Sequence, residues 1–454
     1  LKKVIQNIFI KTKKINNIKL KKNSYKLYNF FIFFKSIFFH IIIYLTINLF
    51  VKKNKVKEKA ILLNTYPSLN PLVPERLYKL KNNLKNNKVV NFYFVPTFII
   101  TRKFYELWKI IQILKKEKNY IFKEHHLSKK NFLYSILHFY RSRKFIDKFH
   151  KYNGYNLSIL VNAEIKSVSN YSSRMNCMLN YYFFEELSLK KIKLKTCVSW
   201  LENQPDKLWN FGLNKFYPNI KSVGYQGFTN IPQLMNSIPA EHEKKYSMLP
   251  KTVISSGKAY VKARKEFYRN LNIKVGPSLV YQDLLNKKKN KKKNIKFLVI
   301  LSDFEDINQS ILELLIKNKE LFKDILIPIK LPKNKSKKDF KIKDLPSNFL
   351  LTNENLQSLI PKSENIICPE ISSTIFESLI SNCYLIIPNI NYSNEYFLKQ
   401  IGIPQNRFTT ISNNSEFIQT IKLLKKKKNN LFYPTGLVNS LFKKVNKKNI
   451  TLLF

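Results

Sequence analysis

Residues 365–391 read NIICPEISSTIFESLISNCYLIIPNIN, and this stretch decides the fold. An apolar run at 366–368 is followed by a Pro-Glu break, a Ser-Ser-Thr cluster and a segment with helical periodicity. A second apolar run, residues 384–387, ends at Pro388. This pattern predicts a strand, a polar turn, a helix and a second strand. Neither run alternates with polar residues, as expected for a parallel sheet that helices cover on both faces.

The polar cluster between the first strand and the helix is a candidate anion site. Ser372, Ser373 and Thr374 lie at the predicted helix start, where free backbone N–H groups and the helix dipole favour negative charge. A diphosphate there would use these groups, and Glu377, one turn on, would accept hydrogen bonds from ribose hydroxyls. The same spacing is also that of a capping box, in which Glu377 only satisfies the backbone at Thr374.

Strands and helices alternate along most of the chain, which predicts an α/β protein with two doubly wound, Rossmann-like domains. In the second series we expect strands at 295–301, 325–329, 349–351, 366–368, 384–387 and 408–411, and helices at 307–317, 354–360, 374–381, 395–401 and 415–426. In the first series we expect strands at 60–63, 89–95, 196–200, 220–225 and 252–255, and helices at 74–84, 105–118, 132–150, 169–189 and 259–271. The central helices of the first series form a large insertion.

A run of lysine and asparagine, NKKKNKKKN at 286–294, separates the two series and is the best linker in the sequence. We therefore divide the chain into a basic, apolar N-terminal segment, a first Rossmann-like domain, this linker, a second Rossmann-like domain and a tail, at 1–57, 58–285, 286–294, 295–430 and 431–454. Two such domains imply a cleft, in which ligands bind at the carboxyl ends of the strands.

The chain is strongly basic: 81 Lys and Arg against 29 Asp and Glu give a net charge of +52 over 454 residues. One interpretation is attraction to nucleic acid or to an anionic membrane surface. The other is a coding bias, because Lys, Asn, Ile, Phe and Tyr are abundant together while only 8 glycines occur. The lysine runs lie in predicted turns and linkers and form no known nucleic-acid module, so we expect no specific nucleic-acid partner.

Residues 30–51 are strongly apolar and match the length of a membrane-spanning helix, about 20 residues. Lys35 and His40 fall inside this segment, where ionisable groups are costly in a bilayer. Three interpretations stay open: a transmembrane span, a helix lying on anionic lipid, and a helix packed on the following domain.

Four cysteines are too few and too dispersed for a disulfide framework or a metal site, and Cys197, Cys368 and Cys383 lie in apolar runs typical of buried thiols. This favours a cytoplasmic protein. No metal motif is present, and we expect Glu305 and Asp306 to open the helix that follows. The glycines form no Walker loop or GxGxxG motif.

Polar loops follow two predicted strands of the first domain. The first contains Trp200, Glu202 and Gln204, and the second contains Tyr225 and Gln226. Glu202 is the candidate general base, since a carboxylate in a cleft can take the proton of a sugar hydroxyl. Alternatively Glu202 orders its own loop. The tryptophans Trp200 and Trp209 are either core residues or a sugar-stacking platform, and the pair His125-His126 is a weaker base candidate that we expect at the surface.

The quoted stretch resembles the donor-binding segment of two-domain glycosyltransferases of the GT-B fold, especially those that make bacterial surface polysaccharides. The resemblance implies that residues 372–374, above all Ser373 and Thr374, contact the donor pyrophosphate and that Glu377 binds the ribose. IPIKLP at 327–332 is similar to the family's strand ending in Lys-His-Pro, so Lys330 would contribute positive charge, although Leu331 replaces the His.

The first domain is similar to a surface-carbohydrate biosynthesis family in its Glu-x-Gln and Gly-Tyr-Gln blocks. This chain has Gly227 where that family usually has His and Val280 where it has Arg. The resemblance implies an acceptor-binding first domain, in which Trp200, Gln204, Tyr225 and Gln226 line the cleft, and a donor-binding second domain that needs no metal or other cofactor.

We therefore expect a glycosyltransferase that uses a nucleotide sugar and a glycan or lipid-linked acceptor at the inner face of the membrane. One alternative is a non-catalytic, membrane-associated component of polysaccharide assembly with a degenerate site. Another is a nucleic-acid-binding protein driven by its charge.

Overall fold

The computed structural model describes residues 22–69, 80, 91–99, 101, 103–146, 150–152, 155–167, 171–201, 205–227, 238–282, 285, 293–302, 304–332, 345–369, 374–389, 395–426 and 435–454. The chain divides into two compact units. Unit 1 comprises Leu1–Pro74, Phe92–Leu194 and Phe211–Pro218; unit 2 comprises Glu75–Asn91, Lys195–Asn210 and Asn219–Phe454.

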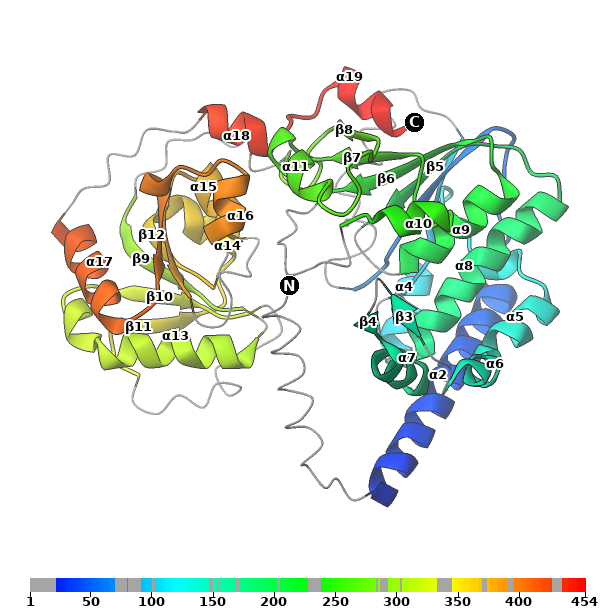
Figure 1. The fold of residues 1–454 in the computed structure, drawn as a ribbon, viewed down its shortest axis with the longest axis horizontal. Helices are drawn as coiled ribbons and strands as arrows, with labels where there is room; N and C mark the ends of the chain where they lie inside the picture. Colours follow the sequence, from blue (N-terminus) through cyan, green and yellow to red (C-terminus); the bar gives the residue numbers. More distant parts are fainter. Residues whose placement is uncertain are drawn as a thin grey trace. The chain divides into compact units, whose positions relative to one another are not determined.

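The second sheet lies wholly in unit 2 and has six parallel strands in the order β11-β10-β9-β12-β13-β14 (Figure 1). Its strands are β9 (Ile295–Ile300), β10 (Ile327–Lys330), β11 (Phe349–Thr352), β12 (Ser363–Ile367), β13 (Tyr384–Pro388) and β14 (Phe408–Ile411). All six were predicted within a few residues, because each contains buried apolar residues next to turn residues or helical segments.

Helices cover both faces of this sheet. They are α13 (Glu305–Lys317), α14 (Leu356–Leu359), α15 (Thr374–Ile380), α16 (Glu395–Gln400) and α17 (Asn414–Lys426). Along β9 the side chains alternate between two cores: Leu298 packs with Phe376 of α15, and Val299 packs with Ile311 of α13 and Phe417 of α17. Burial on both faces explains why the strand carries no polar alternation.

The first sheet also has six strands, in the order β2-β1-β5-β6-β7-β8, and every pair whose register is described is parallel. The strands are β1 (Ala60–Thr65), β2 (Phe92–Pro96), β5 (Leu194–Trp200), β6 (Lys221–Gln226), β7 (Thr252–Ser255) and β8 (Ile273–Val275). The strand pattern did not reveal β8, since it has three residues with a lysine at its centre. The two sheets confirm the predicted class, two Rossmann-like domains.

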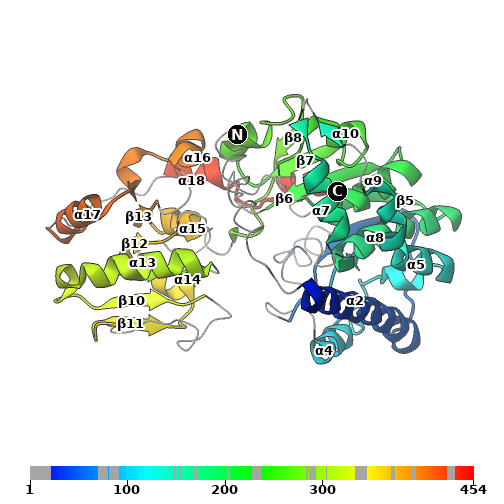
Figure 2. The ribbon, with the colours of Figure 1, turned by 60° about the horizontal axis from the view of Figure 1, so that its bottom comes forward.

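Unit 1 carries the helical insertion (Figure 2). Its helical segments are α2 (Lys22–Phe50), α4 (Phe104–Leu114), η2 (Lys123–His125), α5 (Lys129–Ile136), α6 (His138–Ser142), η3 (Arg143–Phe145), α7 (Ser158–Lys166) and α8 (Tyr171–Leu189), with a small hairpin of β3 (Lys151–Tyr152) and β4 (Tyr155–Asn156). Phe33 of α2 and Phe139, Tyr171 and Met175 of later helices form one core.

The remaining helical segments are α9 (Pro205–Phe216), α10 (Glu241–Lys245), η5 (Lys258–Tyr260), α11 (Val261–Arg264), η6 (Lys319–Phe322), η8 (Ile360–Lys362), η9 (Gln405–Arg407), α18 (Thr435–Leu441), α19 (Lys447–Ile450) and η10 (Thr451–Leu453). The segment expected as a tail therefore contains helices. It returns to the strand ends of the first sheet, where Lys443 N donates to Ser256 O and Ser278 N donates to Lys443 O, each over 2.8 Å.

Two predicted helices are wrong in extent. The helix expected at 132–150 breaks at Leu137, where His138 Nδ1 lies 2.8 Å from Ser135 O and takes that carbonyl out of the helical ladder. The helix expected at 259–271 is limited to η5 and α11, after which the chain continues as single turns.

Candidate functional site

The strand order of the second sheet creates a topological switch point. β9 and β12 are neighbours although two strands, β10 and β11, lie between them in the sequence. In a doubly wound sheet the connections leave such a pair toward opposite faces, and ligands bind outside the carboxyl ends of the strands at this point. The residues that follow β9, β10 and β12 are therefore the candidate site.

The exit of β9 is held by Asn308, a buried residue in the first turns of α13. Its Oδ1 accepts a hydrogen bond from Ser302 N over 2.8 Å, and its Nδ2 donates to Ser302 O over 2.7 Å. This amide clamp fixes the backbone beside the switch point. Glu305 and Asp306 occupy the first turn of α13, as predicted.

Lys330 ends β10, the neighbour of β9, and pairs in register with Ile300 and with Thr352 of β11. The residue is only 9% exposed, and burial lowers the pKa of its ammonium. No residue in the described part of the chain is recorded as a hydrogen-bond or ion-pair partner of this ammonium. An anion bound at this strand end would form a charge-assisted contact with this ammonium.

The exit of β12 leads through Cys368 to α15. Burial raises the pKa of the Cys368 thiol to about 12, and a hydrogen bond from Thr374 opposes this shift. Thr374 is the first residue of α15, its side chain is buried, and its carbonyl accepts from Ser378 Oγ over 2.7 Å. Because its hydroxyl is engaged with the thiol, Thr374 would serve an anion mainly through its backbone N–H.

Glu377 lies in the first turn of α15 and is partly exposed, whereas its neighbours in the helix are buried. Ser372 and Ser373 lie outside the described residues, so their predicted phosphate contacts stay predictions. The structure thus brings Lys330 and the start of α15 to the same edge of one sheet, on either side of β9.

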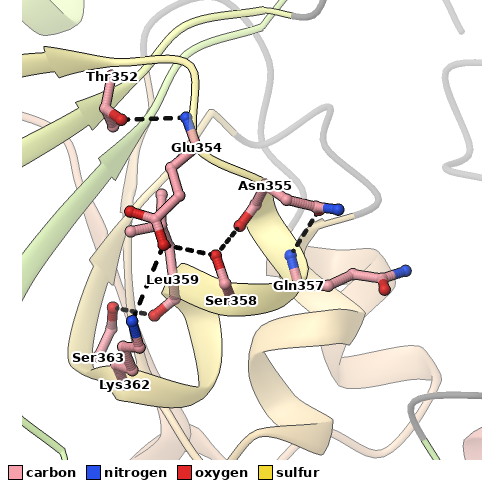
Figure 3. Close-up of polar contacts among 8 residues, drawn as sticks. All are labelled: Thr352, Glu354, Asn355, Gln357, Ser358, Leu359, Lys362 and Ser363. Carbon is pink, nitrogen blue, oxygen red and sulfur yellow. Dashed lines mark hydrogen bonds and ion pairs between the residues drawn. The ribbon is translucent and has the colours of Figure 1, made fainter.

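The connection from β11 to β12 makes the switch, and a set of short-range polar contacts fixes it (Figure 3). Asn355 caps α14 by accepting from Gln357 N over 3.0 Å, and Glu354 N donates to Thr352 Oγ1 over 3.0 Å. Ser358 Oγ lies 2.7 Å from both Glu354 Oε1 and Asn355 O. These contacts fix the conformation of the segment that leads from β11 to the amino end of β12.

The predicted acceptor residues that the structure describes in the first sheet are buried. Trp200 and Tyr225 pack edge to face with ring centroids 5.2 Å apart, and Trp209 is also in the core. Tyr225 Oη donates to Pro277 O over 2.9 Å and accepts from Leu279 N over 3.0 Å. Because these side chains contact other protein groups, they would affect a ligand only by positioning the loops at the ends of the strands.

Gln226 belongs to a polar network that the sequence patterns did not reveal. Its Nε2 donates to Leu201 O over 2.9 Å, and its Oε1 accepts from Arg264, a buried arginine of α11. The network holds the backbone just before Glu202. Glu202 and Gln204 themselves lie outside the described residues, and the general-base role stays a prediction. The sequence feature that could have indicated this network is Arg264, an arginine within the apolar periodicity of 259–271.

Gly227 explains one departure from the resembling family. A Cβ at this position would lie 2.6 Å from Tyr225 Cε1 and 2.8 Å from Trp200 Cη2. The histidine usual there would therefore require both rings to move. The loop after β6 has been packed without a side chain at this point.

We expected the pair His125-His126 at the surface, but His125 is only partly exposed and His126 lies inside unit 1. His126 is buried, and burial lowers its pKa to about 3. The neighbouring Lys123 is also buried, and its Nζ donates to Thr97 O over 2.7 Å and to Asn176 Oδ1 and Asn180 Oδ1 over 2.9 Å each. No sequence pattern indicated this network, because Lys123 is one of many lysines in the chain.

Within the described residues no group of three or more His, Cys, Asp or Glu side chains is placed to hold a metal ion. The thiols predicted to be buried, Cys197, Cys368 and Cys383, are buried and free.

Three solved structures are similar to this chain. UGT89C1 of Arabidopsis thaliana in complex with UDP has a TM-score of 0.50 and 9% identity, covering 87% of this chain and 98% of that chain. UDP-GlcNAc 2-epimerase of Methanocaldococcus jannaschii, in complex with UDP-GlcNAc and UDP, has a TM-score of 0.46 and 13% identity, covering 87% and 99%. MurG of Acinetobacter baumannii has a TM-score of 0.46 and 10% identity, covering 87% and 98%.

No family model and no curated protein matches the chain. At these identities the likeness is one of fold. Together with the two parallel sheets, the match to UGT89C1 shows that the chain has the GT-B fold, as the resemblance implied.

Proposed function

We propose that this protein is a glycosyltransferase that moves a sugar from a nucleoside-diphosphate sugar to a lipid-linked or surface-polysaccharide acceptor. The observation that carries the proposal is Lys330, a largely buried lysine beside the switch point of the second sheet, whose ammonium forms no hydrogen bond or ion pair within the described part of the chain. A donor diphosphate would supply the negative charge that this ammonium lacks. The presence of UDP in a structure of the same fold supports this choice of ligand.

In the proposed reaction an acceptor hydroxyl attacks the anomeric carbon of the donor. A new C–O bond forms, the bond from the anomeric carbon to the phosphate oxygen breaks, and the nucleoside diphosphate leaves with the electron pair. Glu202 takes the proton of the attacking hydroxyl. Lys330 and the backbone N–H groups at residues 372–374 stabilise the charge that develops on the leaving diphosphate, and Glu377 holds the ribose. In this scheme the ammonium provides the positive charge, so we assign no metal or other cofactor.

We place the reaction at the inner face of the membrane. The donor and the free thiols favour the cytoplasm. A lipid-linked acceptor would bring the substrate to the bilayer surface, and the net charge of +52 would hold the enzyme near anionic lipid.

The test is calorimetric titration with UDP, GDP and their sugars. Lys330→Met should weaken nucleotide binding at least about tenfold, because it removes a charge-assisted contact to phosphate. Lys362→Met is the matched control: it removes the same charge from an exposed lysine just before β12, at the opposite edge of the sheet. Glu377→Ala should weaken UDP binding but leave pyrophosphate binding unchanged. If the wild type binds no nucleotide, the proposal is wrong.

The packing at Gly227 favours a second candidate, a non-catalytic component of polysaccharide assembly that still binds the donor. A side chain usual in the resembling family has no room there. Nucleotide binding without hydrolysis or transfer, in the presence of a membrane extract as a source of acceptor, would identify this alternative.

A further inference from the structure

From Phe31 to Phe50, α2 carries apolar side chains on both its buried and its exposed sides. Phe31–Phe50 is long and apolar enough to cross a membrane, yet only part of its surface is buried in the protein. Phe33, Ile43 and Ile47 on one side are buried, whereas on the other side Phe31 is 66% exposed and Leu49 is 71% exposed. A helix that is apolar all round needs an apolar environment on both sides.

The inner side of α2 is fixed to unit 1 by polar contacts as well as by packing. His40 Nε2 lies 2.9 Å from Ser172 Oγ and 3.5 Å from Asn176 Nδ2, and burial keeps this imidazole neutral by lowering its pKa to about 3. His125 Nε2 lies 3.0 Å from Ile47 O. Transfer of α2 into a bilayer as a span would break these contacts and expose the core around Phe33.

The outer side of α2 is continuous with α4, which lies beside it (Figure 2). The rings of Phe38 and Phe104 are 6.0 Å apart, and those of Phe50 and Trp108 are 5.6 Å apart. We call this surface the α2–α4 face and define it by exposed side chains of α2 and α4: Phe31, Phe34, Phe38, Leu49, Phe104 and Trp108. Contiguous exposed apolar patches on soluble proteins mark interaction sites.

Basic side chains surround the α2–α4 face. Exposed lysines lie within α2, just after it, and on both sides of Trp108 in the sequence: Lys35, Lys52, Lys53, Lys103 and Lys109. Residues 22–57 contain no acidic side chain, and Glu106 of α4 is already bonded to Thr101 and paired with Lys103. Like charge disfavours a second copy of this chain as the partner.

From these observations we propose that the α2–α4 face inserts into the headgroup region of an anionic bilayer, with α2 parallel to the membrane plane. Aromatic rings would enter the interface and the lysines would contact lipid phosphates, as in monotopic amphipathic helices. The proposal goes beyond the glycosyltransferase assignment, because it depends on neither the donor nor the acceptor.

Trp108 provides a direct reporter. The chain has three tryptophans, all in the described part, and Trp108 is 44% exposed while Trp200 and Trp209 are buried. The full-length protein should bind phosphatidylcholine vesicles that contain phosphatidylglycerol but not pure phosphatidylcholine vesicles. Lipids brominated near the headgroup should quench its fluorescence, and Trp108→Phe should abolish the quenching. Binding without quenching of Trp108 would mean that another surface docks, and would overturn the proposal.

Substitutions test the face itself. Phe38→Ser combined with Leu49→Ser should weaken vesicle binding at least about tenfold, because two large apolar side chains no longer leave water. Leu423→Ser is the matched control, since Leu423 on α17 is as exposed (58%) as Phe38 (57%). Equal binding by the double variant and the wild type would refute the proposal. So would resistance of the bound protein to alkaline carbonate extraction, which indicates a span. Thermal unfolding of the same variants, monitored by circular dichroism, shows whether they remain folded and keeps this result separate from the donor test.

Discussion

Two buried lysines in different parts of the molecule have opposite surroundings. Lys123 in unit 1 is 1% exposed and its ammonium donates to three oxygen atoms, all from protein. Lys330 at the end of β10 is 9% exposed, and the described residues give its ammonium no recorded partner. An ammonium that the protein fully satisfies serves structure, whereas one without a protein partner is available for a ligand.

The comparison extends to the regions around these lysines. Unit 1 also buries histidines in neutral form, and the second sheet has no histidine at all. We therefore expect substitutions and pH to affect stability mainly in unit 1 and ligand binding mainly in the second sheet.

Acid should have the largest effect. The folded-state pKa values of His40 and His126 are lowered to about 3, below the ordinary value, so the unfolded chain binds more protons than the folded chain between pH 6.5 and 3. Stability is therefore full above pH 6.5 and falls as the pH drops, by about 1.4 kcal/mol per pH unit for each histidine. For both together the loss between pH 6.5 and 5 is about 4 kcal/mol.

Urea unfolding at pH 7 and pH 5 measures this loss, and hydrogen exchange should show that α8 loses protection while β12 and β13 keep it. His126→Leu should remove about half of the pH dependence. Equal stability at the two pH values would show that these imidazoles are not buried and neutral.

Replacing each lysine with methionine should have different effects on stability, because the protein satisfies the ammonium of Lys123 but not that of Lys330. Lys123→Met leaves Thr97 O, Asn176 Oδ1 and Asn180 Oδ1 without their shared donor, and we expect a loss of about 3 kcal/mol in the free energy of unfolding. Lys330→Met removes a charge that the described protein does not satisfy, so it should leave stability unchanged or raise it slightly. Urea denaturation of both variants measures the two effects. If Lys330→Met destabilises the protein as much as Lys123→Met, the two lysines do not differ in the way we describe.

A smaller effect is expected in the connection that forms the switch. Asn355→Ala removes the cap of α14 and should cost about 1 kcal/mol of stability without changing nucleotide affinity. Gln357→Ala is the control, because it keeps the backbone N–H that Asn355 caps. Thermal unfolding monitored by circular dichroism measures the difference. If Gln357→Ala destabilises the protein equally, the cap is not the stabilising feature.

Part of the candidate site was predictable because it depends on local pattern. The stretch 365–391 indicated β12, the start of α15, Glu377 and β13, and the resemblance added Lys330. Other features depend on side-chain contacts that no local pattern indicates. The clamp of Ser302 by Asn308, the contact of Gln226 with Arg264 and the burial of His126 appear only when the elements pack.

The sequence by itself determined where the strands of the two sheets lie, apart from β8, and that the sheets are parallel and doubly wound, because burial on both faces leaves continuous apolar runs. It also determined which thiols are buried. Only the tertiary structure decided the order β11-β10-β9-β12-β13-β14, which places the switch between β9 and β12. It alone showed the surroundings of Lys330, since the sequence shows a charge but not what surrounds it. It likewise showed that one side of α2 is packed on unit 1 while the other faces outward, because periodicity cannot tell the two sides of a uniformly apolar helix apart.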